Sequence, residues 1–296
     1  MHPLLARLVA LLLRAGFGCI RALGPDRATA LGGFLARSIG PLLKQQRIAL
    51  ENVRAAFPEM DDAAHRRIVR EAWDNLGRVA CEYVHLGRMY DFNPQHPDPD
   101  GRILAAPEVV ARTEALRGSG AVLLFSAHLA NWELPALVPA RHGVASAVLY
   151  RTPNNPVVAE EILRLRRGMM GKLIAAGLLA PRRMTEALEE GELVGMLVDQ
   201  HFSRGPKIEF LGRPAFANPL VAQLARRHDC PVHGARAIRL PGGRFRLEMT
   251  EALDLPRDAE GKVDVAGATQ MMNDVIAGWV REYPGQYLWM HRRWRA

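Results

Sequence analysis

Cysteine is scarce in this sequence, and its three copies suggest no pairing. Cys19, Cys81 and Cys230 lie far apart among 296 residues. Such spacing argues against a disulfide framework and against a cysteine zinc site, and it fits a reducing compartment. The histidines also lack zinc-like pairs. We therefore expect no bound metal ion.

The short motifs of nucleotide chemistry and serine hydrolysis are also missing. The sequence contains no glycine-rich phosphate loop and no Gly-x-Ser-x-Gly elbow. It also has no recognisable nucleic-acid module, such as an aromatic-rich RNA-binding strand. We expect no cofactor, no serine nucleophile of that kind and no nucleic-acid partner.

The N-terminal apolar segment is interrupted by charged residues. Residues 3–23 are strongly apolar, but Arg7, Arg14 and Arg21 recur every seven residues, which places them in one stripe on a helix. Arg14 would be costly at the centre of a spanning helix, and it interrupts the core that a signal peptide needs. We predict that residues 1–24 form a membrane-anchoring helix, lying in the interface or spanning; a helix packed on a soluble core is the alternative.

The positive charge lies at the two ends of the chain. The net charge is +8; residues 1–50 contribute +6 and residues 291–296 contribute +3, which leaves −1 for the remainder. Nucleic acid is one partner for basic ends. An anionic membrane surface explains them with fewer assumptions, and the ends would also attract an acidic protein.

Hydrophobic periodicity predicts a helical region followed by an α/β body. The helical region covers residues 25–100: helical patterns run to about residue 86, including a long helix from Asp61 or Asp62 to about Tyr83, and a loop with three prolines follows at 91–101. Residues 101–296 form the body, and 25–296 is expected to make one domain. The predicted strands are 121–127, 145–151, 193–199, 207–211, 232–240 and 245–251. The predicted helices are 107–116, 131–141, 156–173, 184–190, 218–228 and 266–282. This alternation predicts an α/β fold with a mostly parallel central sheet and helices on both faces.

The segment from Ser126 to Glu133 (SAHLANWE) carries the strongest chemical signal. A buried strand leads into it, and Asn131 is expected to cap the following helix. With His128 at the strand end and Glu133 in the first helical turn, the carboxylate could hold one imidazole nitrogen while the other takes a proton from a hydroxyl group. The alternative is a strand-end histidine bonded to backbone, beside an ordinary helix-start glutamate.

Two further polar residues follow predicted strands. Arg151 and Asp199, like His128, fall at the carboxyl ends of strands, where sites of parallel sheets lie. Arg151 could hold a phosphate or a carboxylate, or it is a surface turn residue. Asp199 could orient an arginine, or it caps a turn. Arg164, Arg166 and Arg167 lie on the next helix, whose charges could equally form a solvated face. Residues 205–214 form a hairpin or a flap.

Together these segments resemble the late acyltransferases of lipid A biosynthesis, the lauroyl and myristoyl transferase family. The resemblance covers most of the chain. It rests on NVRAAFPE (52–59), HLANWE (128–133), YR (150–151), DQ (199–200), FLGRPA (210–215) and LWMHRRW (288–294). Glycerol-phosphate acyltransferases, with a similar His-x-x-x-x-Asp pair, are wider relatives. Departures are Asn218, where a small hydroxyl residue is expected, and the short chain after the tail motif.

The resemblance implies an acyltransferase at the cytoplasmic face of the bacterial inner membrane. Its donor would be an acyl carrier protein thioester and its acceptor a glycolipid hydroxyl. Arg166, or Arg164 in another alignment, would match a family arginine.

We therefore expect a membrane-associated O-acyltransferase. His128 would act as the base and Glu133 would fix its tautomer. An arginine (Arg166 or Arg164) or backbone N–H groups at Asn131 would stabilise the oxyanion. Arg151 would bind a phosphate of the acceptor, and Asp199 would serve as a positioning residue in the site. A phospholipid or lysophospholipid acyltransferase is the second hypothesis, and a non-catalytic lipid-binding protein is the third.

Overall fold

The computed structural model of the protein describes residues 3–153 and 155–294, and the side chains from residue 9 onward. Helices α1–α5 occupy the chain up to Met89, and the first strand begins at Ile103. The helices are α1 Pro3–Ala22, α2 Pro25–Ile39, α3 Lys44–Ala56, α4 Asp62–Glu82, α5 Leu86–Met89, α6 Pro107–Ala115, α7 Leu134–Arg141, α8 Pro156–Arg166, α9 Ala180–Glu189, α10 Leu220–His228 and α11 Val265–Glu282, with 3-10 turns η1 Gly40–Leu42, η2 Pro241–Gly243 and η3 Pro284–Gln286.

A seven-stranded sheet forms the centre of the molecule. Its order is β1-β9-β8-β2-β5-β3-β4; β8, β2, β5, β3 and β4 are parallel, while β9 runs antiparallel to β8. The strands are β1 Ile103–Ala105, β2 Val122–Ser126, β3 Ser146–Tyr150, β4 Lys172–Ala175, β5 Leu193–Leu197, β8 Val232–Leu240 and β9 Arg244–Met249, and a separate hairpin pairs β6 Lys207–Phe210 with β7 Arg213–Phe216. The predicted α/β class with a mostly parallel sheet is confirmed.

Helices cover both faces of this sheet. Phe125 of β2 stacks on Trp279 of α11, with ring centroids 5.9 Å apart. The adjacent Leu124 faces a cavity bordered by Pro135 of α7. Because successive strand residues point to opposite faces, α11 and α7 lie on opposite sides of the sheet. The main core, which includes Phe125, lies on the α11 side.

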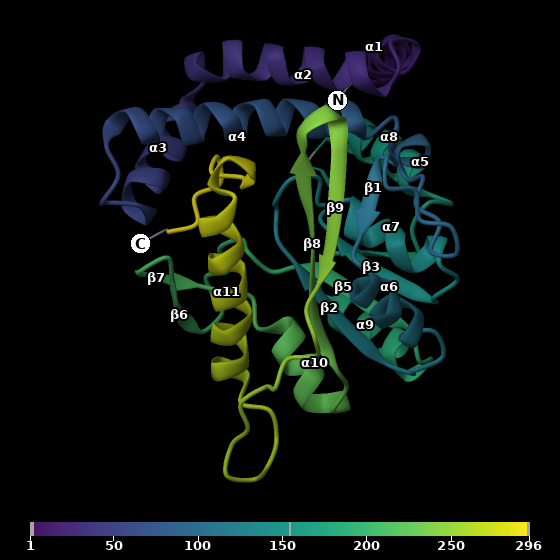
Figure 1. Cartoon of the computed structure of the whole chain (residues 1–296), viewed down its shortest axis with the longest axis vertical. Coiled ribbons are helices and arrows are strands. Elements are labelled where there is room, and N and C mark those ends of the chain that lie inside the picture. The colour runs from purple at the N-terminus through teal and green to yellow at the C-terminus, as the bar shows by residue number, and fades with distance from the viewer. Residues whose placement is uncertain (1–2, 154, 295–296) are drawn as a thin grey trace.

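The N-terminal helices lie across one end of the sheet. In Figure 1 the purple helix α2 lies along the blue helix α4, which itself crosses the end of the sheet. Glycines allow this approach, since a Cβ on Gly77 would clash with the Gly32 carbonyl oxygen. No helix among residues 3–153 and 155–294 is long and apolar enough to cross a membrane.

Two expected elements need correction. The helix predicted over 156–173 ends at Arg166, because residues 172–175 pair with β3 as an edge strand. The helix predicted from Asn131 begins at Leu134. Of the two alternatives for residues 205–214, the structure shows the hairpin, formed by β6 and β7. Strands as short as β1 and β4 carry too little periodicity to be recognised before pairing is known.

Candidate active site

His128 is held by Asp199, across two neighbouring strands. His128 Nδ1 lies 2.8 Å from Asp199 Oδ1, and the His128 backbone N–H donates to Asp199 Oδ2 at 3.0 Å. Ser126 of β2 pairs with Leu197 of β5, so both residues lie two positions beyond the same register pair. Parallel pairing therefore places them together.

This arrangement fixes the histidine tautomer. Burial by itself raises the pKa of the Asp199 carboxyl, but the His128 charge and hydrogen bonds prevail and hold that pKa below its usual range. An ionised carboxylate can only accept, so Nδ1 carries the proton and Nε2 is the acceptor. Gln200 Nε2 lies 3.3 Å from His128 Nε2. Nε2 is thus the atom that can take a proton from a hydroxyl group.

Glu133 does not hold the imidazole, and this expectation is wrong. Its carboxylate binds Arg166 in a bidentate pair, with Nε–Oε2 at 3.0 Å and Nη2–Oε1 at 2.6 Å. The Tyr83 hydroxyl also donates to Oε1 and accepts from Arg166 Nη2. Burial raises the pKa of the Tyr83 phenol far above its usual range, and the Glu133 charge adds to the effect. Burial by itself lowers the pKa of the Arg166 guanidinium. The interactions with Glu133 and Tyr83 outweigh this effect, so that the pKa is raised above its usual value.

The loop between β2 and α7 explains why the predicted pair separates. Ala130 has φ 46°, a left-handed conformation that is costly outside glycine. Its N–H donates to the Gln286 carbonyl, and the Leu288 N–H donates to the His128 carbonyl. The loop is therefore tied to the segment after α11, which turns His128 and Glu133 away from each other.

Asn131 is a structural residue of this loop. It is fully buried; its Oδ1 accepts from the Glu133 N–H at 3.1 Å, and its Nδ2 donates to Glu82 at 2.8 Å. The Leu134 N–H bonds to the Asn131 carbonyl. Because the Asn131 side chain already has partners inside the protein, its expected role in substrate binding is not what this geometry provides, and the Glu133 and Leu134 N–H groups are likewise engaged.

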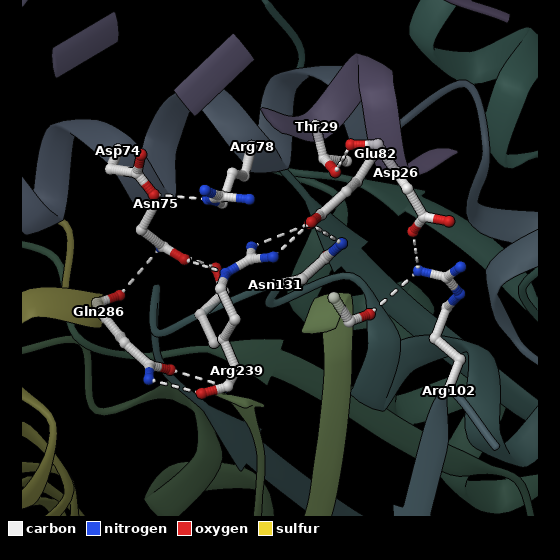
Figure 2. A network of polar contacts seen from close by, with 12 residues as sticks. Asp26, Thr29, Asp74, Asn75, Arg78, Glu82, Arg102, Asn131, Arg239 and Gln286 are labelled. Atoms are coloured by element: carbon white, nitrogen blue, oxygen red, sulfur yellow. Dashed lines mark hydrogen bonds and ion pairs between the residues drawn. The ribbon is translucent and has the colours of Figure 1, made fainter. Parts of the chain in front are cut away.

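A buried polar network lies behind the loop (Figure 2). Arg239 of β8 binds both carboxylate oxygens of Glu82, and its Nε donates to Asn75 Oδ1 at 2.8 Å. Asn75 Nδ2 in turn donates to the Ala130 carbonyl at 3.1 Å. Glu82 also accepts from Asn131. The network joins α4, β8 and the histidine loop, so it fixes the position of that loop.

Replacing Glu82 with alanine is expected to lower the free energy of unfolding by about 3–5 kcal/mol, because Arg239 would remain buried without its anion. Asp26→Ala is the matched control; this carboxylate pairs with Arg102 but is 68% exposed, and its loss should cost about 1 kcal/mol or less. Denaturant unfolding of the two variants measures the difference. Equal losses would mean that the buried network contributes no special stability.

A cavity of about 530 Å³ opens beside His128. Its polar end is lined by His128, Glu133, Arg166, Tyr83 and Gln200. Its apolar part follows one face of three strands, in rows that the register aligns: Ser126, Leu197 and Tyr150 near the site, then Leu124, Gly195 and Val148 deeper, then Leu193. The volume is typical of a small-molecule site, and an extended apolar chain fits its lining.

The other predicted residues divide between the cavity and the surface. Arg151 is exposed and lines the cavity rim. Arg164 faces elsewhere and pairs with buried Glu161 at 2.8 Å, so the structure brings Arg166, not Arg164, to the site. Asn218 also lines the cavity, and its Oδ1 accepts from the Leu220 N–H.

The basic tail is not a free end. Arg293 is buried and donates to the Phe216 carbonyl at 2.6 Å and to Asn273 at 2.9 Å. Arg292 is exposed. One of the expected surface charges therefore stabilises the interior.

Sequence reasoning missed Tyr83 and Gln200. Tyr83 follows the end of α4, far from the histidine segment in the chain, and no local pattern points to it. Gln200 directly follows Asp199, so the strand-end rule could have found it.

Comparison with known proteins gives matches over most of the chain. The family model described as "Bacterial lipid A biosynthesis acyltransferase" matches residues 4–296. The chain is also 26% identical, over 269 residues, to the "Lipid A biosynthesis lauroyltransferase" of Escherichia coli (strain K12), covering 86% of this chain and 80% of that protein.

Proposed function

We propose a specific reaction for this chain, which belongs to the bacterial lipid A biosynthesis acyltransferase family. The chain is an acyltransferase of lipid A biosynthesis. In the proposed reaction, a fatty acyl group moves from an acyl carrier protein thioester to a hydroxyl group of a glycolipid precursor of lipid A. The observation that carries this proposal is the His128–Asp199 pair, with His128 lining a mostly apolar cavity.

His128 acts as the base in this mechanism. Its Nε2 takes the proton of the acceptor hydroxyl as the oxygen attacks the thioester carbonyl, and Asp199 stabilises the imidazolium. When the tetrahedral intermediate collapses, the carbon–sulfur bond breaks and the thiolate takes the proton from His128. The products are an ester and a free thiol, with no covalent enzyme intermediate.

Arg166 supplies the positive charge near the developing oxyanion, and Glu133 and Tyr83 hold its guanidinium in place. Exposed Arg151, at the cavity rim, is the residue we assign to an acceptor phosphate.

The apolar part of the cavity holds the acyl chain in this proposal, and Gly195 lies halfway along it. A Cβ there would meet nothing closer than Leu124 Cβ at 4.0 Å. A larger side chain should therefore fit on the strand and project into the cavity. Gly195 lies two residues, or about 7 Å, deeper than Leu197.

Gly195→Leu is therefore expected to shift donor preference toward shorter acyl chains, by roughly tenfold or more in the ratio of kcat/KM values, since one misfitting side chain is worth about 1–3 kcal/mol. Gly195→Ala should shift the ratio less. Competition between thioesters of different length, read by mass spectrometry, gives the ratio. The shortest donor controls for general loss of activity. An unchanged ratio in both variants would place the acyl chain elsewhere.

We further propose that the enzyme works at the cytoplasmic face of the inner membrane, anchored through residues 1–24. The apolar residues of α1 support this proposal, whereas Arg14 of its basic stripe pairs with Glu161 of α8 at 2.7 Å. The acidic carrier protein would be attracted by exposed positive charge, including Arg292 and Arg151.

One experiment tests donor and acceptor together. The full chain is assayed with an acyl carrier protein thioester and with the coenzyme A thioester of the same acyl group, across a salt series, on a lipid A precursor or on a lysophospholipid. We expect faster transfer from the carrier protein, slowed by salt, and only to the glycolipid. Equal use of both donors without a salt response would contradict the carrier-protein assignment. Transfer to the lysophospholipid alone would favour that acceptor, and no turnover with any lipid would favour a non-catalytic lipid-binding protein.

A further inference from the structure

Exposed apolar side chains are concentrated at one end of the molecule. Among the described residues, twelve large hydrophobic side chains are exposed, and nine of them lie between Leu11 and Leu43. The other three, Leu178, Leu179 and Phe202, lie in loops after strands β4 and β5. Residues 11–43 comprise the described part of α1, all of α2 and the turn η1, so the apolar surface extends well beyond the first helix.

Helix α2 has one packed face and one free face. Ala28, Gly32 and Gly33 are buried, and the two glycines contact α4 closely. Leu31, Leu35 and Ile39 recur every four residues beside this packed face, and they form a single stripe that remains exposed. Phe34 adjoins this stripe, and Leu42 of η1 extends it and is 83% exposed. We call these five residues the α2 face. Figure 1 shows α2 as the outermost layer over α4.

The exposed charges of residues 25–47, near the α2 face, are mostly positive, and one of them, Arg47, pairs with exposed Glu51 at 3.5 Å. Arg27, Lys44 and Arg47 are exposed near its two ends. Asp26, the single acid within residues 1–50, is paired with Arg102 at 2.8 Å. Apolar side chains bordered by exposed cations match a bilayer with anionic headgroups, in which the leucines enter the acyl boundary and the cations remain at the headgroups.

The α2 face is held in a fixed position relative to the active site. The α1 residue Arg14 binds Glu161 of α8 at 2.7 Å, and α8 also carries Ile162 and Arg166, which line the cavity. At the other end of α1, the Ile20 carbonyl lies 3.1 Å from His85 Nε2. Contact of this end of the molecule with a membrane would therefore set how α8 and the cavity face the lipid surface.

We infer that the α2 face is a second membrane-binding surface, which lays the enzyme on an anionic bilayer together with α1. This inference rests on the membrane association in the proposed function and deepens it. It assigns binding to residues 25–43 as well as to residues 1–24, and it gives α2 a role that its packing on α4 does not explain.

The test is co-sedimentation of the full chain with vesicles of phosphatidylcholine, with and without phosphatidylglycerol. The variant L31S/L35S/I39S/L42S is expected to lower the partition coefficient about tenfold or more, because four aliphatic side chains no longer enter the acyl boundary. R27Q/K44Q/R47Q should weaken binding only to vesicles with phosphatidylglycerol, by roughly fivefold per charge. V110S, on α6 away from this end, is the control and should bind like the wild type. Thermal unfolding checks that each variant remains folded.

A second measurement guards against binding dominated by α1. The Phe34→Trp variant should gain fluorescence that brominated lipids quench, whereas Val110→Trp should not. Unchanged partitioning of the quadruple variant together with unquenched fluorescence of Phe34→Trp would overturn the inference, as would a wild-type chain that binds neither vesicle. Conversion of a dimer to a monomer by the quadruple variant would assign the face to self-association instead. Acyl transfer to detergent-dispersed acceptor is measured separately, so failure of the membrane surface and failure of the proposed reaction are distinguishable.

Discussion

His128→Ala is expected to reduce acyl transfer by about 10²-fold or more, the usual contribution of a general base. The expectation follows from the unprotonated Nε2 of a histidine whose Nδ1 is bound by a buried carboxylate, and Asp199→Asn should cause a loss of similar size. The reason in the second variant is that an amide can donate to Nδ1 and leave the proton on Nε2, the wrong tautomer for a base. Steady-state kinetics on a fixed lipid acceptor measure both effects.

The control for this prediction is His96→Ala, which removes an exposed histidine from the loop between α5 and β1. That variant should keep wild-type turnover. Near-normal turnover of folded His128→Ala would exclude the base mechanism. A loss in His128→Ala with none in Asp199→Asn would leave the base in place and remove Asp199 as its orienting partner.

Glu133→Ala is also expected to lower acyl transfer by about 10²-fold, the scale of losing one preorganised oxyanion group. The reason differs from that for His128, since Glu133 acts here through Arg166. Both side chains are largely buried, with exposed fractions of 5% and 13%. Removing the carboxylate leaves a buried cation without its partner, so the free energy of unfolding should fall by about 3–5 kcal/mol as well.

A double-mutant cycle separates these effects. If Glu133 acts only by holding Arg166, then Glu133→Ala/Arg166→Ala should be no slower than Arg166→Ala alone, and it should be more stable than Glu133→Ala. Arg164→Ala is the matched control, because Arg164 lies on the same helix but pairs with Glu161 away from the cavity. Additive losses in the double variant would show that Glu133 has a second, independent contact with the reaction.

Local sequence predicts where the helices and strands lie, but it does not predict which strands are neighbours in the sheet. The strands predicted over 121–127 and 193–199 appear as Val122–Ser126 and Leu193–Leu197, and both were expected to end at chemically active residues. What could not be read was that these two strands are neighbours, although β3 lies between them in the chain. Strand order depends on pairing across long separations, for which neither periodicity nor capping gives a signal.

The assignment of Glu133 to His128 failed for the same reason. Glu133 is the acid nearest to His128 in the chain, and its expected place in the first helical turn after the strand end would bring it within reach of the imidazole. The fold offered closer partners to both residues: Asp199 from the adjacent strand for His128, and Arg166 and Tyr83 for Glu133. Ala130, in the left-handed conformation, then turns the loop between His128 and Glu133. An alanine in the sequence does not predict this conformation.

By itself, the sequence determined the α/β class, the placement of His128 and Asp199 at strand ends and the family resemblance, because all three depend on short-range patterns. Only the tertiary structure decided which acid holds the histidine, that Arg166 rather than Arg164 reaches the cavity, and that Arg293 is buried. These outcomes depend on register, on the crossing of α4 over the sheet and on the docking of the C-terminal segment. Each brings together groups that are distant in the chain, at positions where burial makes the choice of partner energetically important.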